Sequence, residues 1–452
     1  MTNRSSEEKE YVLRTARDND VEFIRLWFTD ILGQLKGFAL NVDDLEDAIE
    51  RGVGFDGSAI EGYARIEESD MRALPDPTTF ALLPWRPRQN AVASMFCDIQ
   101  TPYGEPFPGD PRQVLKRNLA NLAQLGYTYY VGPELEFFYF QDNQNTEPLD
   151  SYGYYDQLSS QPAADLRRNT VLNLSEIGIP VKYSHHEGAP GQHEIDLQYT
   201  DALTMADSVM TAKLVIKELA KLSGAYASFM PKPITGVNGS GMHVHQSLFQ
   251  GDTNAFFDAD DPQHLSLTGR QFIAGLIRHA PEISLVTNQW VNSYKRLVPG
   301  FEAPVYVSWD HQNRSDLIRI PAYKPGFDNS IRVEYRAPDP ACNPYLAFSV
   351  LLAAGIKGIQ EQYPVPPPVE GNMFRMSQEE LSARGISSLP GTLGEAISLA
   401  EQSDLIRETL GEPTCSSLIR NKQIEWDKYL SLIHISEPTR PLYISYAVFC
   451  LK

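Results

Sequence analysis

With 452 residues, 42% of them hydrophobic and 21% charged, the chain has the composition of an ordinary globular protein and enough length for two or three domains. Its formal net charge of −19 argues against a nucleic-acid-binding protein. The first ten residues are polar and acidic, so we expect no signal peptide. The longest apolar run, Leu346–Ile356, is too short to span a bilayer. We therefore expect a cytoplasmic protein with no membrane partner.

The end of the chain differs in character from the rest. Residues Leu430–Lys452 read like translated sequencing-adapter DNA, and we interpret them as a read-through artefact that is not native sequence. Without them the cysteines are Cys97, Cys342 and Cys415, which form no CxxC pair. Unclustered cysteines of this kind are typical of reduced thiols in the cytoplasm.

The first hundred residues predict a small α+β domain. We expect elements in the following order: a helix at Glu7–Asp18, strands at Val21–Phe28 and Leu35–Leu40 forming a hairpin, a helix at Asp43–Arg51 and a strand at Val92–Ile99. The run Thr101–Pro111 carries four prolines and two glycines, which is typical of a domain boundary. We therefore assign residues 1–103 to one domain and residues 104–429 to a second.

The second domain alternates helices and strands. Asp110 and Pro111 fit the N-cap and first residue of a helix, and Gly126 lies past its end. Strands are expected at Val131–Phe140, His193–Tyr199, Gly241–Phe249 and Ile331–Arg336, and helices at Ala163–Ile177, Asp201–Ser223, Thr268–His279 and Asn343–Tyr363. Two later helices are indicated by capping-box pairs, Ser377 with Glu380 and Thr392 with Glu395.

Four of these strands carry polar side chains on one face, where apolar ones are expected. The polar positions, at a period of two, are Glu134 and Glu136; Glu194, Asp196 and Gln198; His243, His245 and Ser247; and Arg332, Glu334 and Arg336. One such set alone favours the water-facing side of an antiparallel sheet. Four sets in one domain predict a curved sheet whose polar inner face lines a cavity.

The residue types on this face indicate metal chemistry. Glu134 and Glu136 lie within the aromatic run Val131–Phe140, and neighbouring buried carboxylates repel each other unless a cation or protons neutralise them. Carboxylates outnumber histidines and no cysteine takes part, which favours Mg²⁺ or Mn²⁺ over zinc. Two hard ions beside several arginines suit phosphoryl transfer, so the residues predict an enzyme that handles a nucleotide and an acidic substrate.

The motifs together resemble type I glutamine synthetases over nearly all of Tyr11–Tyr429. The matching stretches are FDGSAIEGYARIEESDM, GPELEFF, SHHEGAPGQHEID, NGSGMHVH, PGFEAP, NRSDLIRIP and VEYRAPDPACNPY. The resemblance implies an α+β fold, with a β-grasp-like N-terminal domain and a catalytic domain built on an open antiparallel barrel surrounded by helices. It also implies that glutamate, ammonia and ATP give glutamine, ADP and phosphate through γ-glutamyl phosphate.

The resemblance also implies roles for individual residues. One metal would be held by Glu136, Glu187 and Glu194, and the other by Glu134, His243 and Glu334. ATP would contact His245, Ser247, Arg314, Arg319 and Arg332, and glutamate would contact Asn238, Gly239, Arg296, Glu302 and Arg336. Asp56 would bind ammonium in the neighbouring subunit's site, Arg314 would stabilise the transferring phosphoryl group, and Glu302 would close over the acyl phosphate. The partners implied are copies of this chain in stacked hexameric rings.

The sequence also indicates a subtype and departs from the family pattern at some positions. IEGYARIEESDM resembles the α subtype, in which Arg65 would take part in feedback regulation, and Phe374 stands where an adenylylated subtype has tyrosine. Lys182 reverses the charge of a glutamate common in the family, and Gly188 replaces a valine. Lys182 has three readings: it points to water, it pairs with an acid, or it faces the nucleotide.

Two alternatives to glutamine synthesis remain open from the residues. A γ-glutamyl–amine ligase would use putrescine or another amine on the same scaffold, but retention of Asp56 and Glu302 favours ammonium. A catalytically inactive structural homologue should have lost metal-binding glutamates, and all of those expected are present.

Overall fold

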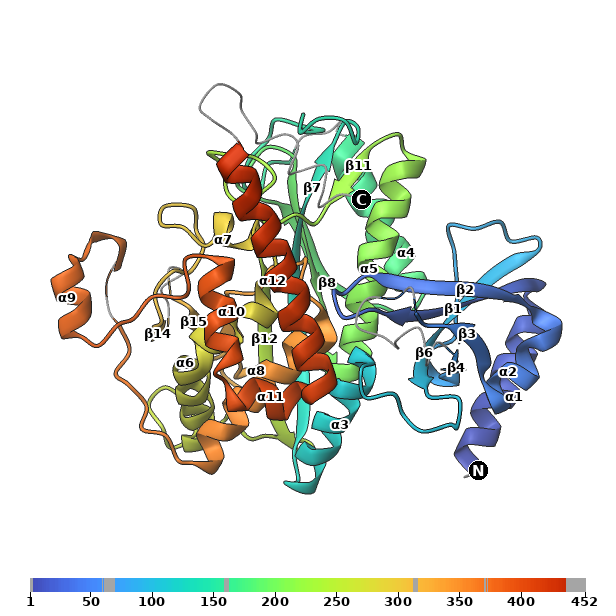
Figure 1. Cartoon of the computed structure of the whole chain (residues 1–452), viewed down its shortest axis with the longest axis horizontal. Helices are drawn as coiled ribbons and strands as arrows, with labels where there is room; N and C mark the ends of the chain where they lie inside the picture. The colour runs from blue at the N-terminus through green and yellow to red at the C-terminus, as the bar shows by residue number, and fades with distance from the viewer. Residues whose placement is uncertain are drawn as a thin grey trace.

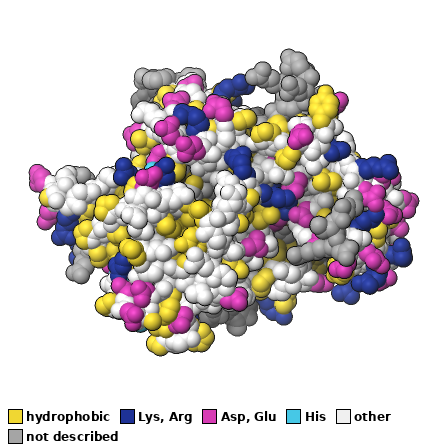
Figure 2. Space-filling model, turned by 90° about the horizontal axis from the view of Figure 1, so that it is seen from below, with side chains coloured by type: hydrophobic (Ala, Val, Ile, Leu, Met, Phe, Trp, Pro, Cys, Tyr) yellow, Lys and Arg dark blue, Asp and Glu magenta, His cyan; other side chains and the backbone are white. Residues whose placement is uncertain are grey.

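The computed structural model describes residues 3–435, except for 59, 61–69, 158–161, 312–315, 370 and 372. A smaller N-terminal domain, blue in Figure 1, lies beside a larger domain that holds the remaining helices and strands. Seen from below, acidic and basic side chains are interspersed over the surface (Figure 2). Within the described ranges, none of the helices is both long and apolar enough to cross a membrane.

The smaller domain is a sheet with two helices. Its elements are α1 (Asn3–Asp18), β1 (Val21–Thr29), β2 (Leu35–Asn41), α2 (Leu45–Arg51), β3 (Val53–Asp56), β4 (Asp70–Pro75), β5 (Ala81–Leu82) and β6 (Ala91–Gln100). The strand order is β2-β1-β6-β4-β3, with β5 paired to β6. The predicted hairpin is confirmed, because β1 and β2 pair antiparallel with Leu26 opposite Phe38. Strand β3, which is not among the expected strands, lies at an edge of the sheet.

The larger domain is organised by a ten-stranded sheet. Its strands are β7 (Thr128–Phe140), β8 (Val181–His186), β9 (Gln192–Leu197), β10 (Thr200–Asp201), β11 (Tyr226–Ser228), β12 (Met242–Gln250), β13 (Thr253–Asn254), β14 (Trp309–Asp310), β15 (Ile318–Arg319) and β16 (Val333–Tyr335). Its helices are α3 (Pro111–Gln124), α4 (Pro162–Glu176), α5 (Ala202–Leu222), α6 (Leu267–Thr287), α7 (Ser293–Arg296), α8 (Pro344–Gln360), α9 (Gln378–Ala383), α10 (Leu393–Glu401), α11 (Asp404–Leu410) and α12 (Glu412–Ile435).

Strand β7 lies at the centre of this sheet, in the order β14-β15-β16-β12-β7-β9-β8. The side chains of Leu135, Phe137 and Tyr139, on the face away from the acids, are fully buried in the main hydrophobic core. Helices α3 and α5 pack against that side of β7. The predicted curved sheet with a polar inner face is therefore confirmed, and burial of the apolar face fixes which side chains turn inward.

Helix ends follow their caps, with two departures from expectation. The predicted N-cap Asp110 accepts a hydrogen bond from the Arg112 amide at 3.0 Å, and the Ser377–Glu380 capping box is complete. In the second predicted box, Thr392 accepts from the Glu395 amide, but the Glu395 carboxylate accepts from the Gly391 amide instead. Helix α6 runs through Pro281 to Thr287, beyond the predicted end at His279, because its buried face continues.

Helix α12 crosses the front of the larger domain in Figure 1 and spans Glu412–Ile435. It therefore continues for six residues into the segment that we interpret as artefact (430–452). Positions 436–452 lie outside the described residues.

Candidate active site

Strand pairing brings the polar residues of four strands onto one surface. Glu134 on β7 lies opposite Asp196 on β9 and His243 on β12, and Glu136 lies opposite Glu194. His245 of β12 lies opposite Glu334 of β16. These pairings follow from the register that buries the apolar faces, because a shift of one residue would turn every acid outward.

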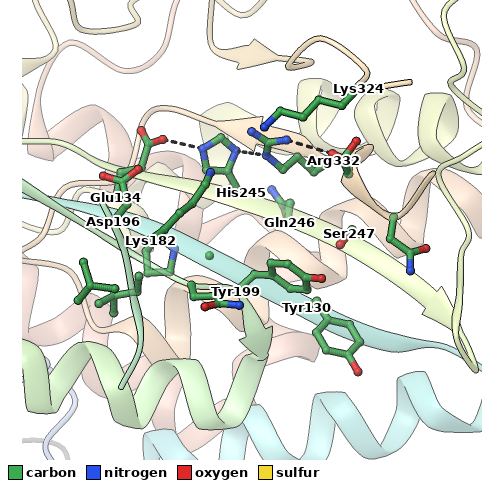
Figure 3. Close-up of a pocket in the computed structure, with 17 residues that line it drawn as sticks. Tyr130, Glu134, Lys182, Asp196, Tyr199, His245, Gln246, Ser247, Lys324 and Arg332 are labelled. Atoms are coloured by element: carbon green, nitrogen blue, oxygen red, sulfur yellow. Dashed lines mark hydrogen bonds and ion pairs between the residues drawn. The ribbon is translucent and has the colours of Figure 1, made fainter. Parts of the chain in front are cut away.

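Glu134 is the centre of a chain of hydrogen bonds. His243 Nδ1 lies 3.0 Å from one of its oxygens, and His245 Nε2 lies 2.7 Å from the other. Arg332 Nε donates to His245 Nδ1 at 3.1 Å, so the proton of His245 lies on Nε2 and is donated to Glu134. Figure 3 shows the part of this chain that runs from Glu134 through His245 to Arg332, along one wall of a pocket.

The electrostatics of the buried acids fall into two groups. Burial, together with the charge of Glu187, raises the pKa of Glu136 to about 8, and burial with the charges of Glu134 and Glu136 raises that of Glu194. Burial opposes ionisation of Glu334 as well, but interactions with His245 and Arg336 lower its pKa to about 2. At Glu136 and Glu194, burial and the neighbouring acids therefore outweigh the groups that favour the charged carboxylate.

The carboxylates and histidines form groups that fit metal ligation. Ligand atoms lie within 4.8 Å of one another in the sets Glu134–His243–Glu334, His185–Glu187–Glu194 and Glu134–Glu194–Asp196. The first set is the second predicted metal triad. Of the other predicted triad, Glu187 and Glu194 come together, and Glu136 lies opposite Glu194 in the ladder. Oxygen-rich sets with one histidine suit hard divalent cations, so the donor chemistry fits the predicted group.

Two pockets meet at these acids. The first pocket, of about 420 Å³, is lined among others by Glu134, Asp196, His245, Ser247 and Arg332. The second pocket, of about 380 Å³, is lined among others by Glu134, Glu136, Glu187, Glu194, His243 and all five of the predicted glutamate-binding residues. Glu134 lines both. The structure thus joins two cavities through one acid cluster.

The predicted glutamate-binding residues line the second pocket, namely Asn238, Gly239, Arg296, Glu302 and Arg336. Asn238 Nδ2 donates to Glu302 at 3.2 Å. Arg296 donates to the backbone carbonyls of residues 336–338, which fixes its side chain. Gly239 admits no side chain, because a Cβ there would lie 2.3 Å from the Pro231 carbonyl oxygen.

Two arginines hold Glu334 from either side. Arg336 Nη1 pairs with one oxygen, and Arg319 Nε donates to the other at 2.6 Å. Arg319 also lines the second pocket, not the first. It therefore reaches the junction of the pockets from the side opposite His245 and Arg332.

The departures from the family pattern also lie at these pockets. Lys182 lines the first pocket, and Figure 3 shows its side chain reaching toward His245 and Glu134. Burial and the nearby charge of Arg332 lower its pKa. Gly188 lies beside the second pocket, where a Cβ would meet the Asn238 amide nitrogen at 3.3 Å, so valine would crowd that side chain.

Among the predicted residues that the structure describes, Asp56 does not come to the pockets of this chain. Asp56 is exposed on edge strand β3, accepts a hydrogen bond from the Ser58 amide at 2.9 Å, and lines neither pocket. Arg65 and Arg314 lie outside the described residues. Phe374 lines the second pocket and packs on Tyr306.

Sequence reasoning missed a buried cluster directly behind the metal-ligand loop. Asp150 accepts hydrogen bonds from His186 Nε2 at 2.8 Å, from His193 Nε2 at 3.1 Å and from the Gly191 amide at 2.9 Å. Arg167 donates to His193 Nδ1 at 2.6 Å. Asp150 had no signal of its own, because it lies in a stretch expected to be loop.

Two protein-family models match the chain over separate ranges. Residues 20–102 match the β-grasp domain of glutamine synthetase, and residues 108–440 match its catalytic domain. The chain belongs to the glutamine synthetase family. Its activity is ATP-dependent glutamine synthesis. Its similarity to glutamine synthetases over nearly the full chain does not favour the alternative of an amine ligase.

Individual relatives cover almost the whole chain. The glutamine synthetase of Mycolicibacterium smegmatis is 51% identical over 444 residues, covering 97% of this chain and 99% of the relative. That of Methanosarcina mazei is 49% identical, with 96% and 97% covered. Among solved structures, the complex of GmaS with ADP has a TM-score of 0.84 at 31% identity, covering 93% of this chain and 96% of that one. Plasmodium falciparum glutamine synthetase has a TM-score of 0.84 at 25% identity, with 95% and 97% covered.

Proposed function

We propose that glutamine is made at the junction of the two pockets, with ATP in the first pocket and glutamate in the second. The observation that carries this division is Glu134, which lines both pockets and contacts His243 and His245. A phosphoryl group passed between the pockets must cross this point. His245, Ser247 and Arg332 line the ATP side.

The acid cluster is the proposed metal centre, holding two Mg²⁺ or Mn²⁺ ions. Its proposed ligands are Glu136, Glu187 and Glu194 for one ion and Glu134, His243 and Glu334 for the other. When bound, such ions neutralise charge on the phosphate oxygens and on the carboxylates that surround them. The raised pKa of Glu136 and Glu194 supports this assignment, because burial and neighbouring acids disfavour the charged form of both carboxyl groups unless a cation is present.

The chemistry has two steps. A γ-carboxylate oxygen of glutamate takes the γ-phosphoryl group of ATP, giving ADP and γ-glutamyl phosphate. The nitrogen lone pair of ammonia then forms a bond to the carbonyl carbon of γ-glutamyl phosphate, phosphate leaves with the electrons of the carbon–oxygen bond, and the nitrogen loses a proton to give the amide. Arg319 and Arg336 flank the junction and stabilise the negative charge that spreads over the transferring oxygens, and Arg314 is proposed to share this role.

Glu302 is proposed to close over the acyl phosphate and exclude water. It lies in the segment 299–304 at the mouth of the second pocket, with a φ of +55° and an exposed side chain tied to Asn238. A non-glycine residue in the left-handed region is held there by its surroundings and is frequent at functional loops. This segment therefore has the geometry of a strained flap.

Substitution Glu302→Ala tests this proposal. We expect ATP binding to remain close to that of the parent, while much of the phosphate is released without glutamine, because water reaches the intermediate. Phosphate release and glutamine formation are measured in the same reaction. The matched control is Glu361→Ala, an exposed glutamate of the α8 C-terminus whose one ion pair among the described residues is with Lys357 at 3.8 Å. Unchanged coupling in Glu302→Ala would show that this residue is not the flap.

The exposed position of Asp56 supports sites shared between subunits. Asp56 lies on an edge strand of the smaller domain and lines neither pocket of its own chain. We propose that it binds ammonium in a neighbouring copy and helps remove a proton before attack, within stacked hexameric rings.

Mixing two inactive variants tests the shared site. Asp56→Ala and Glu136→Ala each remove a component from every site of a homo-oligomer. In mixed oligomers, a Glu136→Ala subunit supplies Asp56 to a neighbour that retains Glu136, so part of the activity returns. If each chain completes its own site, mixing restores nothing. Size-exclusion chromatography confirms that the mixed sample is assembled.

A further inference from the structure

A cavity of about 470 Å³ lies behind the substrate pocket, between the β1–β2 turn, helix α5, strand β11 and the segment around Trp290. Three lysines line it, namely Lys36, Lys213 and Lys217. The described residues that line it include no acid, although the chain carries a net charge of −19. We call it the lysine cavity. A cavity lined by one sign of charge concentrates ions of the opposite sign.

Two of the three lysines lack an anionic partner. Lys213 and Lys217 are four residues apart on α5, and their ammonium nitrogens lie 5.8 Å and 5.6 Å from the centre of the Phe229 ring. Within the described part of the chain neither makes an ion pair or a hydrogen bond, whereas Lys36 pairs with Asp30 at 3.3 Å. Like charges at this helical spacing repel each other. Lys213 is half-buried, and burial, with the charge of Lys217, lowers its pKa to about 8.

The remaining wall is apolar. Phe229, Met210 and Met230 line the cavity beside the lysines, and Phe229 packs on Phe137 of the central strand. A ligand that satisfies both halves of the wall carries a negative group on an apolar body. We propose that the lysine cavity binds a small organic anion through Lys213 and Lys217, with a carboxylate or phosphate at the ammonium groups and its apolar part against Phe229.

The lysine cavity shares its wall with the second pocket. The Pro231 carbonyl oxygen accepts a hydrogen bond from the Ser240 amide at 2.8 Å and lies directly under Gly239. On the other side, the segment 290–292 leads into α7, which carries Arg296. An occupant would therefore contact the backbone that positions Gly239 and Arg296. On the proposed function, its binding changes the affinity for glutamate.

Calorimetric titration of the full chain tests the binding site without using activity. The probes are phenyl phosphate and benzoate, with uncharged benzamide as the control for burial of the ring. The variants are Lys213→Gln/Lys217→Gln and the matched control Lys221→Gln, one turn further along α5 and outside the cavity. We expect saturable binding of at least one anion to the parent and to Lys221→Gln, and a loss of roughly tenfold or more in the double variant.

The two anions decide between phosphate and carboxylate as the bound group. Absence of saturable anion binding to the parent, or equal binding to the double variant, would overturn the proposal, as would equally tight binding of benzamide. The Michaelis constant for glutamate, measured with and without the bound anion, then tests the coupling separately. It should shift in the parent and in Lys221→Gln and stay constant in the double variant.

Discussion

Two buried clusters of acids and histidines adjoin the loop that carries Glu187. They differ in how their buried charges are stabilised. In the Asp150 cluster, made of Asp150, His186, His193 and Arg167, the polar atoms find partners within the chain. In the acid cluster, made of the proposed metal ligands Glu134, Glu136, Glu187, Glu194, His243 and Glu334, burial and mutual repulsion raise the pKa of Glu136 and Glu194. Both have the residue types of a metal site, and only the second needs a cation.

The hydrogen bonds of the Asp150 cluster fix its protonation. His186 donates from Nδ1 to the Glu187 carbonyl oxygen and from Nε2 to Asp150, so it is an imidazolium, in agreement with a pKa that its bond to Asp150 raises against burial. His193 accepts from Arg167 and is neutral, and burial lowers its pKa to about 4. Each charged group of the Asp150 cluster therefore has a hydrogen-bonding partner within the chain. The acid cluster differs from it in the raised pKa of Glu136 and Glu194.

Removal of Glu136 should have the largest effect on function. Glu136→Ala is expected to abolish turnover and to reduce the number of divalent ions bound in calorimetric titration, because the remaining acids then repel one another around an incomplete site. His243→Ala should behave in the same way, and Glu147→Ala, an exposed glutamate in the loop before Asp150, should change neither measurement. Unchanged stoichiometry in Glu136→Ala would make Glu136 a structural residue like Asp150.

Asp150→Asn should act on stability and not on metal stoichiometry. It leaves the buried imidazolium of His186 without its counter-charge, which costs about 3–5 kcal/mol. The measurement is the midpoint of urea unfolding, with the exposed Asp156→Asn of the same loop as control. Loss of a metal ion without loss of stability would reverse the roles of the two clusters.

Lys182→Glu should have the smallest effect, and it should change only the Michaelis constant for ATP. Lys182 lines the first pocket near Glu134 and Arg332, so a glutamate there adds repulsion toward the ATP phosphates. A change of one charged hydrogen bond, about 1.5–3 kcal/mol, raises the Michaelis constant for ATP roughly tenfold to a hundredfold. The constant for ammonium should stay as it is. Lys221→Glu, on the surface of α5, is the control, and a change below about twofold would make Lys182 a bystander.

Much of the fold followed from local patterns, and the failures lie where contacts between distant segments decided the structure. The β1–β2 hairpin and the Asp110 cap formed where turn and capping residues predicted them. Strand β8 (Val181–His186) was not expected, because it carries polar residues without an apolar partner face and forms through pairing with β9. The end of α6 was placed too early, because long-range packing keeps the helix going through Pro281.

The sequence by itself determined the chemistry of the site, because residue types at a period of two on four strands state which side chains share a face. Glutamates and histidines on those faces indicated hard metal ions before any contact was known. What only the tertiary structure decided is which charges are balanced. Asp150 pairs with His186 and His193 across 36 and 43 positions of chain, and Lys213 faces Phe229 and makes no ion pair within the described part of the chain. Whether a buried charge has a partner depends on distances between segments that are remote in sequence. Local sequence patterns contain no information about those distances.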